Sequence, residues 1–160
     1  MRAADIMTAR VVTVSADTSV AEIARLMLTH RIGAIPVVDS ESHVVGIVSD
    51  HDLLGRPAAD SARSWWLALF SGGEASVADI AKACRLRAED VMHVRVRTVS
   101  EETPINTLGN LMQRHRLKHV PVTRHGKLVG IVSRSDLLAA LLGGHDKVPL
   151  ASPEYRFFNE

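Results

Sequence analysis

An internal repeat constrains this chain more than any other feature of its 160 residues. Residues 5–36 match residues 90–121 position by position at a constant offset. Beyond the proline that ends each match, Gly46-Ile47-Val48-Ser49 recurs as Gly130-Ile131-Val132-Ser133, with one residue lost from the intervening turn. Self-similarity on this scale indicates a duplicated structural unit. We therefore expect two copies of one fold.

Each copy predicts the element order β-α-β-β-α. A short strand (residues 11–14 and 96–99) precedes apolar residues at helical spacing, and two β-branched runs around a polar turn then predict a hairpin. A second helix should begin near Asp50 or Arg134. Ser19 offers a cap to the first helix, and Pro104 is expected at the first position of its counterpart. The helical faces are Val20, Ile23, Ala24 and Met27, then Ile105, Leu108 and Met112; the hairpin strands are 35–38 with 44–48, and 120–122 with 128–132.

A unit of roughly 50 to 60 residues is marginal alone, so the copies should pack together and share a core. The fold class expected is α/β (α+β), with two units related by a pseudo-two-fold axis and the functional cleft at their junction. We divide the chain into a first unit (1–56), a helical linker (57–87), a second unit (88–143) and a C-terminal tail (144–160). The linker tryptophans, Trp65 and Trp66, are expected to brace the pair or to form a dimer contact.

Composition narrows the classes of partner. A formal net charge of +1 argues against nucleic acid as a main partner. The most apolar run, residues 65–70, is too short to cross a bilayer, so no membrane span is expected. The single cysteine, Cys84, cannot form an internal disulfide and is expected to be a buried structural thiol, and no signal peptide is recognisable at Met1. These features favour the cytoplasm.

One motif occurs at the end of both units: Gly-apolar-apolar-Ser-x-x-Asp at a strand-to-helix junction. Free backbone N–H groups and the serine hydroxyl can receive a phosphate there, and the aspartate (Asp52 or Asp136) can accept hydrogen bonds from a ribose diol. Ser-x-x-Asp is also close to a capping box, so a purely structural role is the alternative. Arg134, beside Ser133, can bind phosphate through its planar fork, whereas Asp50, beside Ser49, repels an anion.

Each unit has a Met-Thr-like start, a Thr-Val strand, an x-Pro-Val hairpin and a final Gly-Ile-Val-Ser-x-x-Asp. Together these motifs resemble the CBS domain, here in tandem as in bacterial CBS-pair proteins. The resemblance implies clefts that bind AMP, ADP or ATP, with Ser49 and Asp52 in one site and Ser133 and Asp136 in the other. It implies that residues just before the hairpin proline reach across to the opposite repeat's phosphate; these are Lys118 and His119 in the second copy, but Gly33 and Ala34 in the first. The implied adenine contacts are Val12, Val14 and Ile35, or Arg97, Val99 and Val120.

The function expected is a regulatory sensor that binds an adenosine nucleotide and acts on a partner protein in trans, as a homodimer of CBS pairs. The alternative is a ligand-free structural or interaction module. No catalytic motif is recognisable, so we expect neither an enzyme nor a catalytic cofactor, and a nucleotide-hydrolysing enzyme is the remaining competitor. The eight histidines show no ligand spacing, so no metal site is expected.

Overall fold

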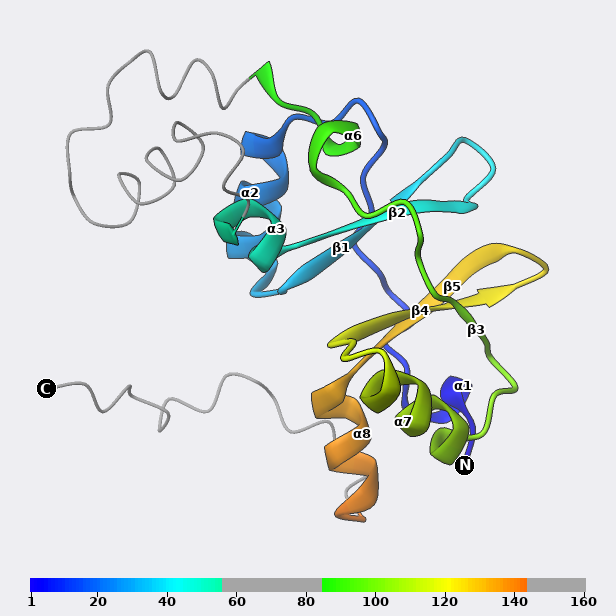
Figure 1. Ribbon diagram of the computed structural model, residues 1–160. Coiled ribbons are helices and arrows are strands. Elements are labelled where there is room, and N and C mark those ends of the chain that lie inside the picture. Colours follow the sequence, from blue (N-terminus) through cyan, green and yellow to red (C-terminus); the bar gives the residue numbers. More distant parts are fainter. Residues whose placement is uncertain (56–84, 144–160) are drawn as a thin grey trace, which may run out of the picture.

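The structure, a computed structural model, describes residues 1–55 and 85–143 (Figure 1). The predictions for the linker tryptophans, Cys84 and the tail lie outside these residues. Two α+β units are placed one above the other, each built from a hairpin and two main helices (Figure 1). The first unit contains α2 (Val20–His30), β1 (Ala34–Val38), β2 (Val44–Ser49) and α3 (Asp50–Gly55). The second contains β3 (Val99–Ser100), α7 (Ile105–Arg114), β4 (His119–Arg124), β5 (Lys127–Ser133) and α8 (Arg134–Leu141).

The first long helix of each unit follows its apolar pattern. In α2 the buried residues are the four predicted from spacing, and the Glu22 N–H donates to the Ser19 hydroxyl at 3.2 Å. In α7, Leu108 and Met112 are buried as predicted. Pro104 differs from the prediction, because it is the extended N-cap residue and the helix begins at Ile105. The reason is tertiary: Arg2, the residue before α1, forms an isolated antiparallel bridge with Pro104 and holds it extended.

The hairpins are confirmed, whereas the strands before the long helices are shorter than predicted. β1 pairs with β2, and β4 with β5, both antiparallel. In the first unit only Val14 pairs with β1, through a parallel bridge to Val37. In the second unit pairing begins at Val99, opposite Val122 of β4. The alternation of residues 96–99 is typical of a strand, but only its last residue has a neighbour to pair with.

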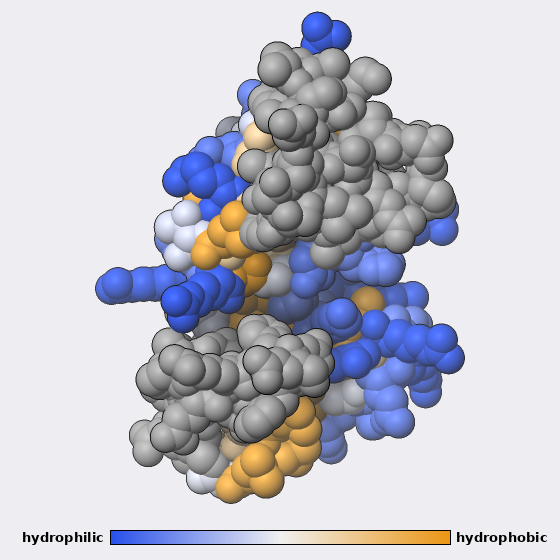
Figure 2. All heavy atoms as spheres, turned by 90° about the vertical axis from the view of Figure 1, so that its left-hand side faces the viewer, coloured by the Kyte–Doolittle hydropathy of each residue, from blue (hydrophilic) through white to orange (hydrophobic). Residues whose placement is uncertain are grey.

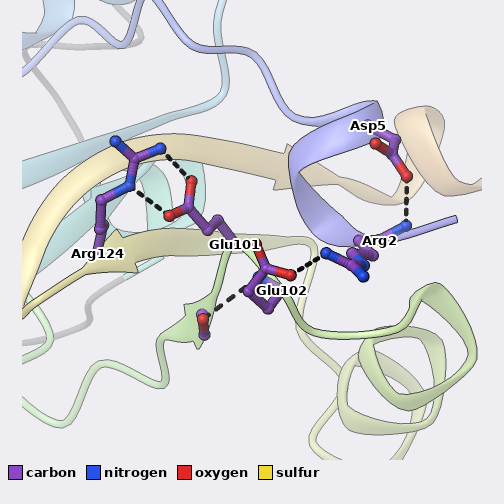
Figure 3. Close-up of polar contacts among 6 residues, drawn as sticks. Arg2, Asp5, Glu101, Glu102 and Arg124 are labelled. Carbon is purple, nitrogen blue, oxygen red and sulfur yellow. Dashed lines mark hydrogen bonds and ion pairs between the residues drawn. The ribbon is translucent and has the colours of Figure 1, made fainter.

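The short helix before each unit packs on the opposite unit. α1 (Ala3–Ile6) lies beside α7 and α8 of the second unit, and α6 (Ala88–Val91) lies beside α2 of the first (Figure 1). Ala3 is fully buried in the second core, and Ala88 is fully buried in the first. The Arg2 guanidinium also pairs with Glu102 of the second unit, next to the Arg124–Glu101 pair (Figure 3). The chain therefore exchanges its leading segments between the two cores.

The same exchange explains why methionine and glycine recur together in the repeat. The Met7 side chain lies over Gly130 of the second unit, and Met92 lies over Gly46 of the first. A Cβ at Gly130 would lie 2.3 Å from Met7 Sδ, and a Cβ at Gly46 would lie 2.3 Å from Met92 Sδ. Both glycines are buried in their strands. They leave room for a side chain from the opposite half of the chain.

Candidate functional site

The two Ser-x-x-Asp motifs have the same local geometry at the starts of α3 and α8. Both Ser49 N–H and Ser49 Oγ donate to Asp52 Oδ2 at 2.8 Å. Ser133 N–H and Oγ donate to Asp136 Oδ2 at 2.7 and 2.8 Å. In return each serine hydroxyl accepts the aspartate N–H, at 3.4 Å in the first unit and 3.2 Å in the second. The motifs therefore form capping boxes, and each box uses one carboxylate oxygen.

The second carboxylate oxygen distinguishes the two motifs. Asp52 is only 5% exposed, and its Oδ1 lies 2.6 Å from Nε2 of His93. Asp136 is half-buried, and within the described residues its Oδ1 has no hydrogen-bond partner. An ionised carboxylate oxygen is an acceptor only. Asp136 can therefore accept a hydroxyl of a ligand without breaking its cap.

Arg134, at the start of α8, contacts the backbone just before β4, where Lys118 lies. The Arg134 N–H donates to the carbonyl of Lys118 at 3.0 Å, and Arg134 Nε donates to the carbonyl of Leu117 at 2.8 Å. Lys118 and Arg134 are both exposed, and His119 is half-buried. The Nε bond holds the Arg134 side chain back toward the segment before β4.

His119 also reaches the first unit. Its Cε1 would lie 3.6 Å from a Cβ at Gly33, and a carboxylate oxygen of Asp50 would lie 3.5 Å from that same Cβ. The small residues before the first hairpin leave the space that this imidazole occupies. Burial lowers the pKa of His119, while the negative charge of Asp50 opposes that shift, Lys118 adds to it and Asp136 also opposes it. His119 is thus the predicted site residue that lies between the two helix starts.

The residues predicted to contact adenine do not share one environment. Val14, Ile35 and Val120 are 7%, 0% and 0% exposed and belong to the two cores. Their side chains face inward because each packs beneath a helix of its own unit. Val12 and Val99 are half-buried and Arg97 is exposed. The role of these six residues stays a prediction.

Two cavities lie in the described part of the chain, and one of them includes a residue of the predicted site. One of about 200 Å³ opens between the units, where Val11 and Val38 of the first face Leu128 and Val129 of the second. Another of about 540 Å³ lies between β3 and α7 and is lined by Val99, a predicted adenine contact, with Asn110, Arg114 and others. The other residues of both cavities were not predicted from the sequence as site residues. Within the described part of the chain, no helix is long and apolar enough to cross a membrane.

His93 is the residue that sequence reasoning missed. The spacing of the histidines along the chain predicts no ligand cluster, so it assigns His93 no role. One signal was available: the repeat aligns His93 with Thr8, so the two copies differ there. The difference could be interpreted only from the structure, in which His93 contacts Asp52.

Comparison with known proteins finds one family. A family model described as "CBS domain" matches residues 3–58 and 88–143. The YlbB protein of Bacillus subtilis (strain 168) is 33% identical over 134 residues, covering 83% of this chain and 77% of that protein. The solved CBS domain of a CBS domain-containing membrane protein from Sphaerobacter thermophilus is 33% identical, with a TM-score of 0.70 and 86% of each chain covered. CBSX2, an Arabidopsis thaliana protein solved in complex with AMP, is 26% identical, with a TM-score of 0.69 and 89% of this chain and 96% of that chain covered.

Proposed function

The chain belongs to the CBS domain family, of which it carries two tandem copies, and from this premise we propose that it is a regulatory sensor for an adenosine nucleotide. The AMP complex of CBSX2 supports this ligand class. The observation that carries the proposal is the half-buried Asp136 at the start of α8, with one carboxylate oxygen capping the helix and the other open to a ligand hydroxyl. Ligand binding would act by shifting the equilibrium between states of the pair that a partner protein distinguishes.

The chemistry of an adenosine nucleotide fits the groups around that oxygen. A ribose diol donates hydrogen bonds to a carboxylate acceptor, as in dinucleotide-binding folds. The phosphate would lie near Arg134, whose guanidinium supplies charge-assisted donors, whereas the resemblance assigns Lys118 and His119 to the phosphate position of the opposite repeat. The ligand is AMP, ADP or ATP in this proposal, and it is released unchanged. We accordingly propose no catalytic activity; incubation with ATP and magnesium should yield no ADP.

Titration of the full chain with AMP, ADP and ATP tests the proposal. A ligand at about 100 times its dissociation constant stabilises the native state by about 2.7 kcal/mol, which a melting experiment detects. Asp136→Asn should abolish this shift, because the amide can still cap α8 through its oxygen but presents a donor where the ribose needs an acceptor. Ser135→Ala, an exposed neighbour on the same helix turn, is the matched control and should bind as the wild type does.

A ligand-free interaction module is the second candidate, and the capping boxes favour it, because they give both Ser-x-x-Asp motifs a structural role without a ligand. That candidate predicts no change in melting temperature with any of the three nucleotides. It also predicts that Asp136→Asn changes only the stability of the unliganded protein.

Self-association forms part of the proposal, because nucleotide binding could then change the interface between the two chains of a homodimer. Leu138, Leu141 and Leu142, at the end of α8, are 60–87% exposed. Figure 2 shows hydrophobic surface at the corresponding end of the molecule. Sedimentation at a protein concentration of tens of micromolar distinguishes a dimer from a monomer, because this is roughly the concentration range in which small interfaces dissociate. We expect a dimer.

A further inference from the structure

The two aspartates that the repeat makes equivalent have unequal freedom to bind a ligand. Both use Oδ2 for the helix cap. Asp52 Oδ1 contacts Nε2 of His93, while Asp136 Oδ1 has no hydrogen-bond partner among the described residues. Asp52 is 5% exposed, whereas Asp136 is half-buried. The acceptor needed by a ribose diol is therefore occupied in one unit and available in the other.

The same backbone pairing places His93 in the first unit and Thr8 in the second. His93 exchanges two hydrogen bonds with Ile47 of β2, at 3.1 and 3.0 Å. Thr8 exchanges two with Ile131 of β5, at 2.9 and 3.1 Å. Both residues follow a short helix that is packed on the opposite unit. Because the main chain is held alike, the difference between the two aspartates comes from the side chains at positions 93 and 8.

A threonine at this position leaves its aspartate open, and a histidine closes it. From its backbone position beside Ile47 of β2, the imidazole is long enough to reach Asp52 Oδ1, and Nε2–H is a suitable donor to a carboxylate. A nucleotide at Asp52 would have to displace this bond from a nearly buried carboxylate. Asp50 at the same helix start adds a negative charge beside the phosphate position.

We propose that His93 is a specificity-determining residue that closes the Asp52 position to ribose, so that each chain binds one nucleotide, at Asp136. This inference rests on the proposed function. His93 itself contacts no ligand; it acts by occupying an acceptor. A merely structural contact between the units would affect stability without affecting the number of nucleotides bound.

Exchanging the two side chains tests the inference, with AMP as the titrant in calorimetry. Wild type should bind one AMP per chain. His93→Thr copies the second unit into the first and should raise the number to two. Thr8→His copies the first unit into the second and should reduce the number to zero. The double variant, with both residues exchanged, should again bind one AMP.

Asp136→Asn in the otherwise wild-type chain supplies a second measurement that leaves His93 in place. It should bind no AMP, because the remaining site is closed, and adding His93→Thr should restore one. A circular dichroism melt of each variant establishes that it is folded.

Several results would overturn the inference. Two AMP molecules bound by the wild type, or one bound by Asp136→Asn alone, would show that the Asp52 position is open despite His93. A folded His93→Thr variant that still binds one would show that another residue closes it. These results leave the proposed function intact. The absence of binding of AMP, ADP and ATP by both the wild type and folded His93→Thr would instead overturn the proposed function.

Discussion

At the scale of single residues, His119 has the most informative surroundings. Its half-buried imidazole comes from the first residue of β4 but lies beside Gly33 and Asp50 of the first unit. The charged groups that act on it are Asp50 of α3, Asp136 of α8 and the adjacent Lys118. Burial has the largest effect on its pKa and lowers it, because the charged imidazolium loses hydration.

This lowered pKa predicts the direction in which stability depends on pH. Below the usual histidine value of 6.5 the unfolded chain holds a proton at His119 that the folded protein takes up less readily. The contribution of His119 to stability is therefore fully present above pH 6.5 and decreases as the pH falls below it. His119→Gln should therefore weaken the pH dependence of the free energy of unfolding, measured by urea titration between about pH 7.5 and 5.5.

His30→Gln, at the exposed end of α2, is the control for removing any histidine. If the His119 variant retains the full pH slope of the wild type, the titrating group lies elsewhere.

At the scale of elements, the spacing of apolar residues and the polar turns between them predicted most of the helices and strands. The buried faces of α2 and α7 follow from apolar spacing, and both hairpins follow from β-branched runs around polar turns. The failures occurred where an element depends on a distant segment. Pro104 is extended because residue 2 pairs with it, and residues 96–98 remain unpaired because β3 begins at Val99. Local sequence carries no information about such partners.

The candidate site shows the same division. The two Ser-x-x-Asp motifs could be found from sequence because residues three apart at a helix start contact each other, whatever the rest of the chain does. The closure of Asp52 by His93 could not, because these residues are far apart in the chain and meet through the exchange of segments. The clustering of Val14, Ile35 and Val120 in the cores likewise depends on which face of each strand the helices cover.

The cap on α8 makes a prediction for that element. Ser133 Oγ accepts the Asp136 N–H at 3.2 Å, so Ser133→Ala should lower the free energy of unfolding by about 1 kcal/mol. Ser135→Ala lies two residues further along, is exposed and should change stability by less than about 0.5 kcal/mol. Urea titration of both variants measures the difference. Equal effects would mean that the hydroxyl at Ser133 does not stabilise the helix.

At the scale of the whole molecule, the exchange of leading segments makes the two units depend on each other. The first residues of the chain complete the core of the second unit, where Ala3 packs in the cluster that contains Leu108 and Met112. Residues 85–93 do the same for the first unit, where Ala88 is buried. Each unit thus borrows a segment that precedes the other in sequence, and neither core is complete within one repeat. The unit borders predicted from the repeat, 1–56 and 88–143, stay a prediction, because the leading segment of each range packs on the opposite unit.

A charge introduced into the first exchanged segment should therefore damage the unit at the other end of the chain. Ala3 is 0% exposed, and its N–H donates to the Thr103 carbonyl at 2.8 Å. Ala3→Asp would bury an unpaired carboxylate in the second core and should cost about 3–5 kcal/mol, the range for an uncompensated buried charge. Hydrogen exchange should show protection lost in β4 and β5 before β1 and β2.

Ala4→Asp is the matched control for this variant. The Ala4 N–H makes a similar bond, to the Glu101 carbonyl at 3.0 Å, but its side chain is exposed, so a carboxylate there stays hydrated. Its stability should remain within about 0.5 kcal/mol of the wild type. The exchange would be contradicted if the two variants were equally destabilised, or if Ala3→Asp first exposed the amides of β1 and β2. In either case the N-terminal segment would not be part of the second core.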